Sequence, residues 1–163
     1  MASISASGTG FAALTRGWAA LPLARLSLAI SAAALLIGAS PAATLDVQID
    51  KLRSAKGLVR ICLTRDPGNF PDCVDDAEAI TQSIPADAPA TAFPGLSPGD
   101  YAIAVIHDEN ANARLDTFAG IPKEGVGFSR NPKFTFGPPR FAAACFTLNG
   151  DAGRQQVRMR YFL

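Results

Sequence analysis

The sequence predicts an all-β protein, folded as a single antiparallel β-sandwich of about seven strands. Apolar and polar residues alternate with a period of two in five stretches, which is typical of half-buried strands. Clusters of Gly, Pro, Asn and Asp separate these stretches and are typical of tight turns. A sustained helical period is missing from the sequence after the N-terminal segment. Short strands joined by frequent turns favour a sandwich.

The alternation is clearest at the start, where Leu45, Val47 and Ile49 would share one face of a strand. A later stretch has apolar residues on both faces, so we expect that strand to be covered on both sides. A short helical turn could form within residues 74–82. The predicted strands are residues 45–50, 58–64, 100–107, 143–150 and 155–162, with shorter candidates at 79–84, 91–93 and 125–128.

Residues 107–140 interrupt this pattern with a connection of about 34 residues, far longer than the usual loop. Loops of this length in compact domains are generally functional or disordered. Six of the ten Phe residues lie in or just after this connection, and such a composition argues against disorder. We therefore expect a long, ordered excursion from the sandwich.

Residues 1–42 have the features of a secretory signal peptide. They contain no acidic residue, and an apolar run at 26–37 follows Arg25. Ser40 and Ala42 suit the positions before a cleavage site. The run has about 12 residues, short of the roughly 20 that span a bilayer, although an uncleaved anchor is the alternative. The prediction is cleavage near Ala42, a domain over residues 43–163 and a periplasmic or secreted location.

The remainder of the chain is close to neutral. It keeps all 14 acidic residues and 13 of the 15 Lys and Arg, a net charge of −1. This gives no electrostatic reason to expect nucleic acid or an anionic membrane as partner. We expect a monomer without a membrane span, and a partner in the cell envelope or outside the cell.

All three Cys residues lie in this exported part, where an oxidising compartment favours disulfides. Cys62 and Cys73 bracket a short loop rich in turn-forming residues, and we favour this pair over the other two pairings. Closing that loop would stabilise the fold by roughly 3 kcal/mol in the chain-entropy model. Cys145 would remain as a packed small residue or, alternatively, as a reactive thiol.

Three linked motifs resemble the DUF2141 family of exported bacterial proteins: PGDYAIAVIHDENANARLDT, GIPKEGVGFSRNP and FGPPRF. The resemblance extends from about Leu45 to the end of the chain. It implies an immunoglobulin- or prealbumin-like sandwich and no particular activity, since the family's function is unknown. The family pattern HDxNxNGxxD usually has Gly where this chain has Ala111 or Ala113.

The segment after the predicted strand at 100–107 has the spacing of a calcium loop. Asp108, Asn110 and Asn112 would provide side-chain oxygens, Arg114 its carbonyl and Asp116 the ninth position. The sequence therefore indicates a possible weak calcium site, with affinity in the roughly 10⁻⁴ to 10⁻³ M range of extracellular modules.

Two features of this segment favour the alternative, an Asx-rich turn without metal. Position twelve lacks the bidentate Glu, although Glu124 could fold back towards the loop. Ala113 stands where a calcium loop normally has Gly, and positive φ there would cost on the order of 1 kcal/mol. Asp and Asn side chains readily bond to their own backbone.

His107 is the only histidine and is a candidate general base or metal ligand. It has no second His or Cys at ligand spacing, so we expect its ring to bond a backbone group of the long excursion. The sequence favours a non-enzymatic binding or structural module. The alternative is a periplasmic hydrolase that uses His107 with nearby carboxylates, namely Asp108, Glu109, Asp116 and Glu124.

The aromatic residues of the excursion suggest a binding surface, although most of the rings are expected to pack under the loop. Basic residues in the same stretch would favour an acidic peptide or glycan. The residues predicted for this surface are His107, Phe118, Phe128, Arg130 and Phe136.

Overall fold

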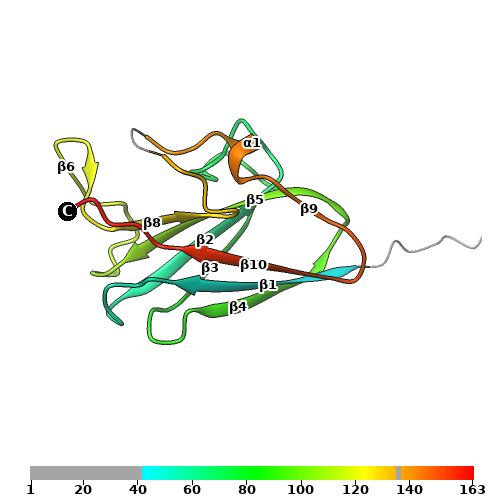
Figure 1. The fold of residues 1–163 in the computed structure, drawn as a ribbon, viewed down its shortest axis with the longest axis horizontal. Coiled ribbons are helices and arrows are strands. Elements are labelled where there is room, and N and C mark those ends of the chain that lie inside the picture. Colours follow the sequence, from blue (N-terminus) through cyan, green and yellow to red (C-terminus); the bar gives the residue numbers. More distant parts are fainter. Residues whose placement is uncertain (1–41, 135–136) are drawn as a thin grey trace, which may run out of the picture. The chain divides into compact units, whose positions relative to one another are not determined.

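Two β-sheets form a sandwich-like fold in this computed structural model, which describes residues 42–134 and 137–163 (Figure 1). The smaller sheet contains β10 (Ala152–Arg158), β1 (Ala43–Asp50) and β4 (Ala90–Leu96), in that order. The larger sheet has the order β3 (Ile80–Pro85), β2 (Leu58–Thr64), β5 (Gly99–Asp108) and β8 (Gly125–Phe128), with β9 (Phe146–Leu148) paired to the start of β5. The predicted all-β class is confirmed.

Alternate side chains of both sheets meet in one apolar core. Leu45, Val47 and Ile49 of β1 are at most 1% exposed, as the predicted alternation requires. They join buried residues of the larger sheet, including Ile103 and Val105 of β5, in a single cluster. Each such side chain contributes roughly 1.5–3 kcal/mol through removal of apolar surface from water. This shared core is the observation that makes the two sheets a sandwich.

One strand pair is parallel, which departs from the expected antiparallel pattern. β1 pairs with β10 in parallel and with β4 in antiparallel orientation. A parallel pair requires a long connection, and these strands are the first and last of the domain. The finer prediction of an immunoglobulin- or prealbumin-like sandwich stays a prediction.

Several predicted boundaries are corrected by the structure. The expected strand at 143–150 is shortened to β9 because α1 (Phe141–Ala144) precedes it. The strand expected at 155–162 starts earlier and ends at Arg158. The helical turn expected within 74–82 is wrong: the carboxylate of Asp76 accepts a hydrogen bond from the N–H of Glu78, 2.9 Å away, and this Asx turn replaces the helix.

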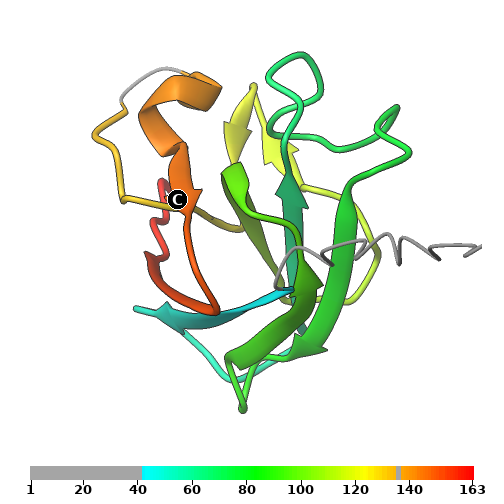
Figure 2. The same cartoon turned by 90° about the vertical axis from the view of Figure 1, so that its right-hand side faces the viewer.

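The outer face of the larger sheet is partly covered by loops. Figures 1 and 2 both place α1, the hairpin of β6 (Thr117–Phe118) and β7 (Ile121–Pro122), and the loop between β2 and β3 at the top of the domain. The short strand predicted at 125–128 is confirmed as β8 and lies within the long excursion.

The disulfide between Cys62 and Cys73 is confirmed and joins β2 to the following loop. Cys145 is half-buried and unpaired, and burial raises the pKa of its thiol. A raised pKa lowers the thiolate fraction, which fits a packed residue better than a reactive thiol.

The predicted signal peptide falls on residues 1–41, which lie outside the described residues, and on Ala42 directly before β1. Among the residues that the structure describes, no helix is both long and apolar enough to cross a membrane.

Candidate functional site

A buried carboxylate organises the loop that follows β5. Asp108 is the last residue of β5 and is completely buried. Its Oδ1 accepts a hydrogen bond from the N–H of Asn112 (3.0 Å), and its Oδ2 accepts one from the N–H of Ala113 (2.9 Å). The Nε of Arg60 donates to the same Oδ2 over 2.5 Å. Burial alone would raise the pKa of Asp108, but these donors outweigh it and hold the pKa below its ordinary value.

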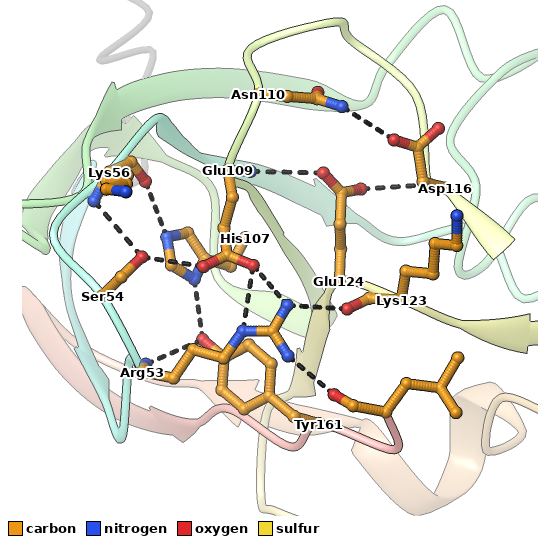
Figure 3. A network of polar contacts seen from close by, with 11 residues as sticks. Arg53, Ser54, Lys56, His107, Glu109, Asn110, Asp116, Lys123, Glu124 and Tyr161 are labelled. Atoms are coloured by element: carbon orange, nitrogen blue, oxygen red, sulfur yellow. Dashed lines mark hydrogen bonds and ion pairs between the residues drawn. The ribbon is translucent and has the colours of Figure 1, made fainter.

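The two Asn side chains are oriented by the backbone of the loop itself. Oδ1 of Asn110 accepts from the N–H of Asn112, and Oδ1 of Asn112 accepts from the N–H of Arg114. Their amide Nδ2 atoms therefore face Asp116 and donate to its Oδ2 over 2.8 and 3.1 Å. Figure 3 shows the first of these contacts. Nitrogen donors, rather than oxygen ligands, thus converge on the Asp116 carboxylate.

This arrangement does not fit a calcium ion. Calcium requires six to eight converging oxygens, whereas Asn110 and Asn112 direct their oxygens to backbone N–H groups and their amide Nδ2 atoms to Asp116. Among the described residues, no group of three or more His, Cys, Asp or Glu side chains could hold a metal ion. The calcium site stays a sequence-based prediction without support from this geometry, which matches the Asx-rich turn.

The two alanines of this loop, one of which stands where the resembled pattern has Gly, have left-handed backbone conformations: φ is 57° at Ala111 and 67° at Ala113. We expect Ala113→Gly to raise the free energy of unfolding by about 1 kcal/mol, because Gly removes the steric cost of positive φ. Urea denaturation would measure the change. Ala88→Gly is the matched control, because Ala88 is an exposed turn residue without positive φ and its replacement should destabilise the fold. Equal effects of the two substitutions would contradict the assignment of strain to Ala113.

A second buried carboxylate closes the far end of the loop. Glu124 does fold back, but its oxygens accept hydrogen bonds from the N–H groups of Glu109 (3.2 Å) and Asp116 (3.1 Å) rather than binding a metal (Figure 3). Burial raises the pKa of Glu124. The N–H of Lys123 also donates to the carbonyl of Asp116. These bonds hold both ends of hairpin β6–β7 at a defined place beside the larger sheet.

Glu109 connects the loop to the chain segment between β1 and β2. Its Oε2 accepts from Nε and Nη2 of Arg53 over 3.0 and 2.5 Å, and its Oε1 accepts from the hydroxyl of Ser54. The Arg53 guanidinium holds the pKa of Glu109 below its usual value. Arg53 also donates to the carbonyls of Lys123 and Leu163, so one guanidinium joins three distant segments (Figure 3).

The ring of His107 is completely buried and bonded at both nitrogens. Its Nε2 donates to the carbonyl of Lys56 over 2.9 Å, and its Nδ1 lies 2.7 Å from the hydroxyl of Tyr161 (Figure 3). The predicted bond to a backbone group therefore exists, but the carbonyl belongs to the β1–β2 connection and not to the long excursion. The reason is strand alternation, since His107 shares the core-facing side of β5 with Val105.

A groove of about 780 Å³ lies on the opposite side of the larger sheet. Its floor is formed by outward-facing residues of β3, β2, β5 and β8, including Arg60, Ile106 and Phe128. Hairpin β6–β7 forms one wall through Ile121 and Pro122. The remaining walls come from the disulfide loop, the segment before α1 and the C-terminus; their apolar residues include Pro71, Val74, Phe134, Pro138 and Phe162.

The residues predicted for a binding surface do not gather in one place. Phe128 lies on the groove floor, whereas His107 is buried on the other face of the sheet. Phe118 is exposed on the hairpin but does not line the groove, and Arg130 is exposed and donates to the carbonyl of Cys145. Phe136 lies outside the described residues. The groove itself was not predicted.

A family model described as "Uncharacterized protein conserved in bacteria (DUF2141)" matches residues 47–156. The chain belongs to the DUF2141 family. The predicted resemblance is thereby confirmed. No curated protein and no solved structure matches the chain. The DUF2141 match includes the acidic loop of residues 108–116 and every groove residue except Phe162. Both features thus lie within the part of the chain that defines its family membership.

Proposed function

We propose that this DUF2141 protein is an exported, non-enzymatic binding module of the cell envelope, and that the groove on the larger sheet is its binding surface. The observation that carries the proposal is the exposure of large apolar side chains around a concave, mainly apolar floor. Val74, Leu115, Ile121 and Phe162 are all exposed and all line the groove. Grouped exposed apolar side chains are characteristic of binding sites, and the volume is typical of sites for small molecules.

Export is supported by the composition of residues 1–42 and by the disulfide, which fits an oxidising compartment.

The hydrogen bonds of the acidic loop, residues 108–116, support a structural role for it. The carboxylates of Asp108, Glu109 and Glu124 accept hydrogen bonds within the protein and hold the hairpin that forms one groove wall. The hydrolase alternative has no support from this geometry, because the His107 ring that it requires is buried and bonded at both nitrogens.

Ile121→Glu is expected to weaken binding of an uncharged apolar dye by about tenfold or more. The substitution places a carboxylate on the groove wall, and contact with an apolar ligand would then require its desolvation. Phenylnaphthylamine is a suitable dye, because its emission increases in apolar surroundings and gives the dissociation constant directly.

Phe118→Glu is the matched control. Phe118 pairs with Ile121 in the same hairpin and is exposed, but it does not line the groove. Dye binding by this variant should equal that of the wild type. Equal dye affinity in both variants, or no dye binding by the wild type, would remove the groove as a binding surface.

A further inference from the structure

The floor of the groove changes in polarity across the sheet. The strand register places Ser83, Arg60, Ile106 and Val126 in one row across β3, β2, β5 and β8. A second row on the same face contains Thr81, Cys62, Ala104 and Phe128. The β3 and β2 side therefore presents hydroxyl and guanidinium groups, and the β5 and β8 side presents only apolar groups. A ligand that lies across the strands would contact a polar end and an apolar end.

Arg60 is the polar group best placed to recognise a ligand. Its side chain is 28% exposed, and its Nε and Nη1 donate to Asp108 and Ser83. Within residues 42–134 and 137–163, its Nη2 donates to no protein atom. A guanidinium with unused N–H donors beside an apolar floor favours a carboxylate, because charge-assisted hydrogen bonds are stronger than neutral ones.

The other charged residue that lines the groove is Asp72. It is exposed on the disulfide loop, where water and salt screen its charge. Since Asp108 offsets the charge of Arg60, recognition of an anion here depends on the direction of the N–H donors more than on net charge.

The apolar end is closed by aromatic rings. Phe134 meets Phe128 edge to face at 5.2 Å between ring centroids, and Phe162 lies 5.8 Å from Phe134. From Arg60 on β2, two strand spacings across the sheet and two residues along β8 lead to Phe128. This span is roughly 12 Å, which equals the length of an extended chain of about nine carbon–carbon bonds. The groove is thus long enough for one linear hydrocarbon chain of moderate length.

We infer that the groove binds a single free amphiphile, a linear hydrocarbon chain with a carboxylate head. The inference rests on the change of polarity across the groove floor, on the free donors of Arg60 and on the length of the apolar part. The head bonds to Arg60 and the tail lies over β5 towards Phe128 and Phe134. This assignment rests on the proposed function of the groove and adds the chemical class of its ligand.

The test is displacement of phenylnaphthylamine by three ligands with a linear chain of twelve carbons: dodecanoate, in which the carboxyl carbon is the twelfth, dodecanol and dodecyltrimethylammonium. Each is used below its aggregation concentration. We expect dodecanoate to displace the dye at about tenfold lower concentration than the other two. Equal potency of the three ligands would overturn the assignment of a carboxylate head, while dye binding that depends on Ile121 would still support the groove.

Arg60→Lys provides a second test, because it keeps the positive charge beside Asp108 but loses the planar fork of donors. The variant should bind dodecanoate about tenfold more weakly and dodecanol as well as the wild type does. An unchanged affinity for dodecanoate in a folded variant would overturn the inference. If the variant does not fold, as judged by its thermal transition, the comparison of the three ligands on the wild type decides.

Discussion

Asp108→Asn should lower the free energy of unfolding by about 2–3 kcal/mol, because it breaks the ion pair with the partly exposed Arg60 and leaves buried N–H groups without a full set of acceptors. The wild-type carboxylate accepts bonds from Arg60 and from two backbone N–H groups. An amide can replace only some of these acceptors, and its own NH₂ group would face other donors. Urea denaturation at neutral pH measures the loss.

The effect of this substitution should also depend on pH. The folded-state pKa of Asp108 is lowered, so its ionised form stabilises the protein above the ordinary carboxyl pKa. That contribution is lost as the pH falls through the lowered folded-state pKa. The difference in stability between wild type and Asp108→Asn should therefore shrink on acidification. Asp116→Asn is the control: Asp116 is not fully buried and accepts from side-chain amides, so its replacement should cost less than about 1 kcal/mol. Equal losses for the two variants would contradict the central role of Asp108.

Gly57→Ala is expected to destabilise the fold by about 3 kcal/mol or more. Gly57 has φ of 73°, and a Cβ there would lie 2.1 Å from the carbonyl oxygen of Asp108 and 2.7 Å from backbone atoms of Glu109. Positive φ costs an alanine roughly 1–2 kcal/mol, and overpacking typically adds 1–3 kcal/mol. The overlapping atoms are backbone, so a change of rotamer cannot relieve the contact. The shift of the thermal and urea transitions measures the cost.

Gly95→Ala separates the two contributions. Gly95 also has a left-handed backbone, with φ of 78°, but a Cβ added there would have no atom within 4 Å. Its replacement should cost only the conformational term, about 1 kcal/mol. The difference between the two variants then reports the close approach of the β1–β2 connection to the end of β5. If both variants lose the same stability, that close approach is not an important constraint.

Much of the fold could be predicted from alternation, because burial on one face of a strand selects apolar residues at every second position. Leu45, Val47 and Ile49 show this directly. The parallel pairing of β1 with β10 could not be predicted, since it depends on where two distant segments meet after folding. Local polar bonds can also replace a predicted helical turn, and the Asx turn at Asp76 is an example.

Alternation predicts only part of the candidate site. Alternation along β5 places Ile106 and Asp108 on one face and His107 on the other, which separates the histidine from the groove. Because β5 has apolar residues on both faces, the sequence also indicates that the face opposite the core is covered. The groove could not be predicted, because its walls come from segments that are far apart in the sequence and share no pattern of apolar residues. The spacing of Asp and Asn after β5 fits both a calcium loop and an Asx-rich turn. The two differ only in whether the side-chain oxygens point to a shared centre or to backbone N–H groups.

A two-dimensional NMR titration of the purified protein with phenylnaphthylamine tests directly whether the groove is the binding surface. If the groove is the binding site, the amide signals that shift will be those of its floor and hairpin wall, including Cys62, Ala104, Ile106 and Ile121. Signals of the core strand β1 will remain in place. Shifts confined to β1 and the β1–β2 connection, or no saturable shifts at all, would show that the groove is not the binding surface.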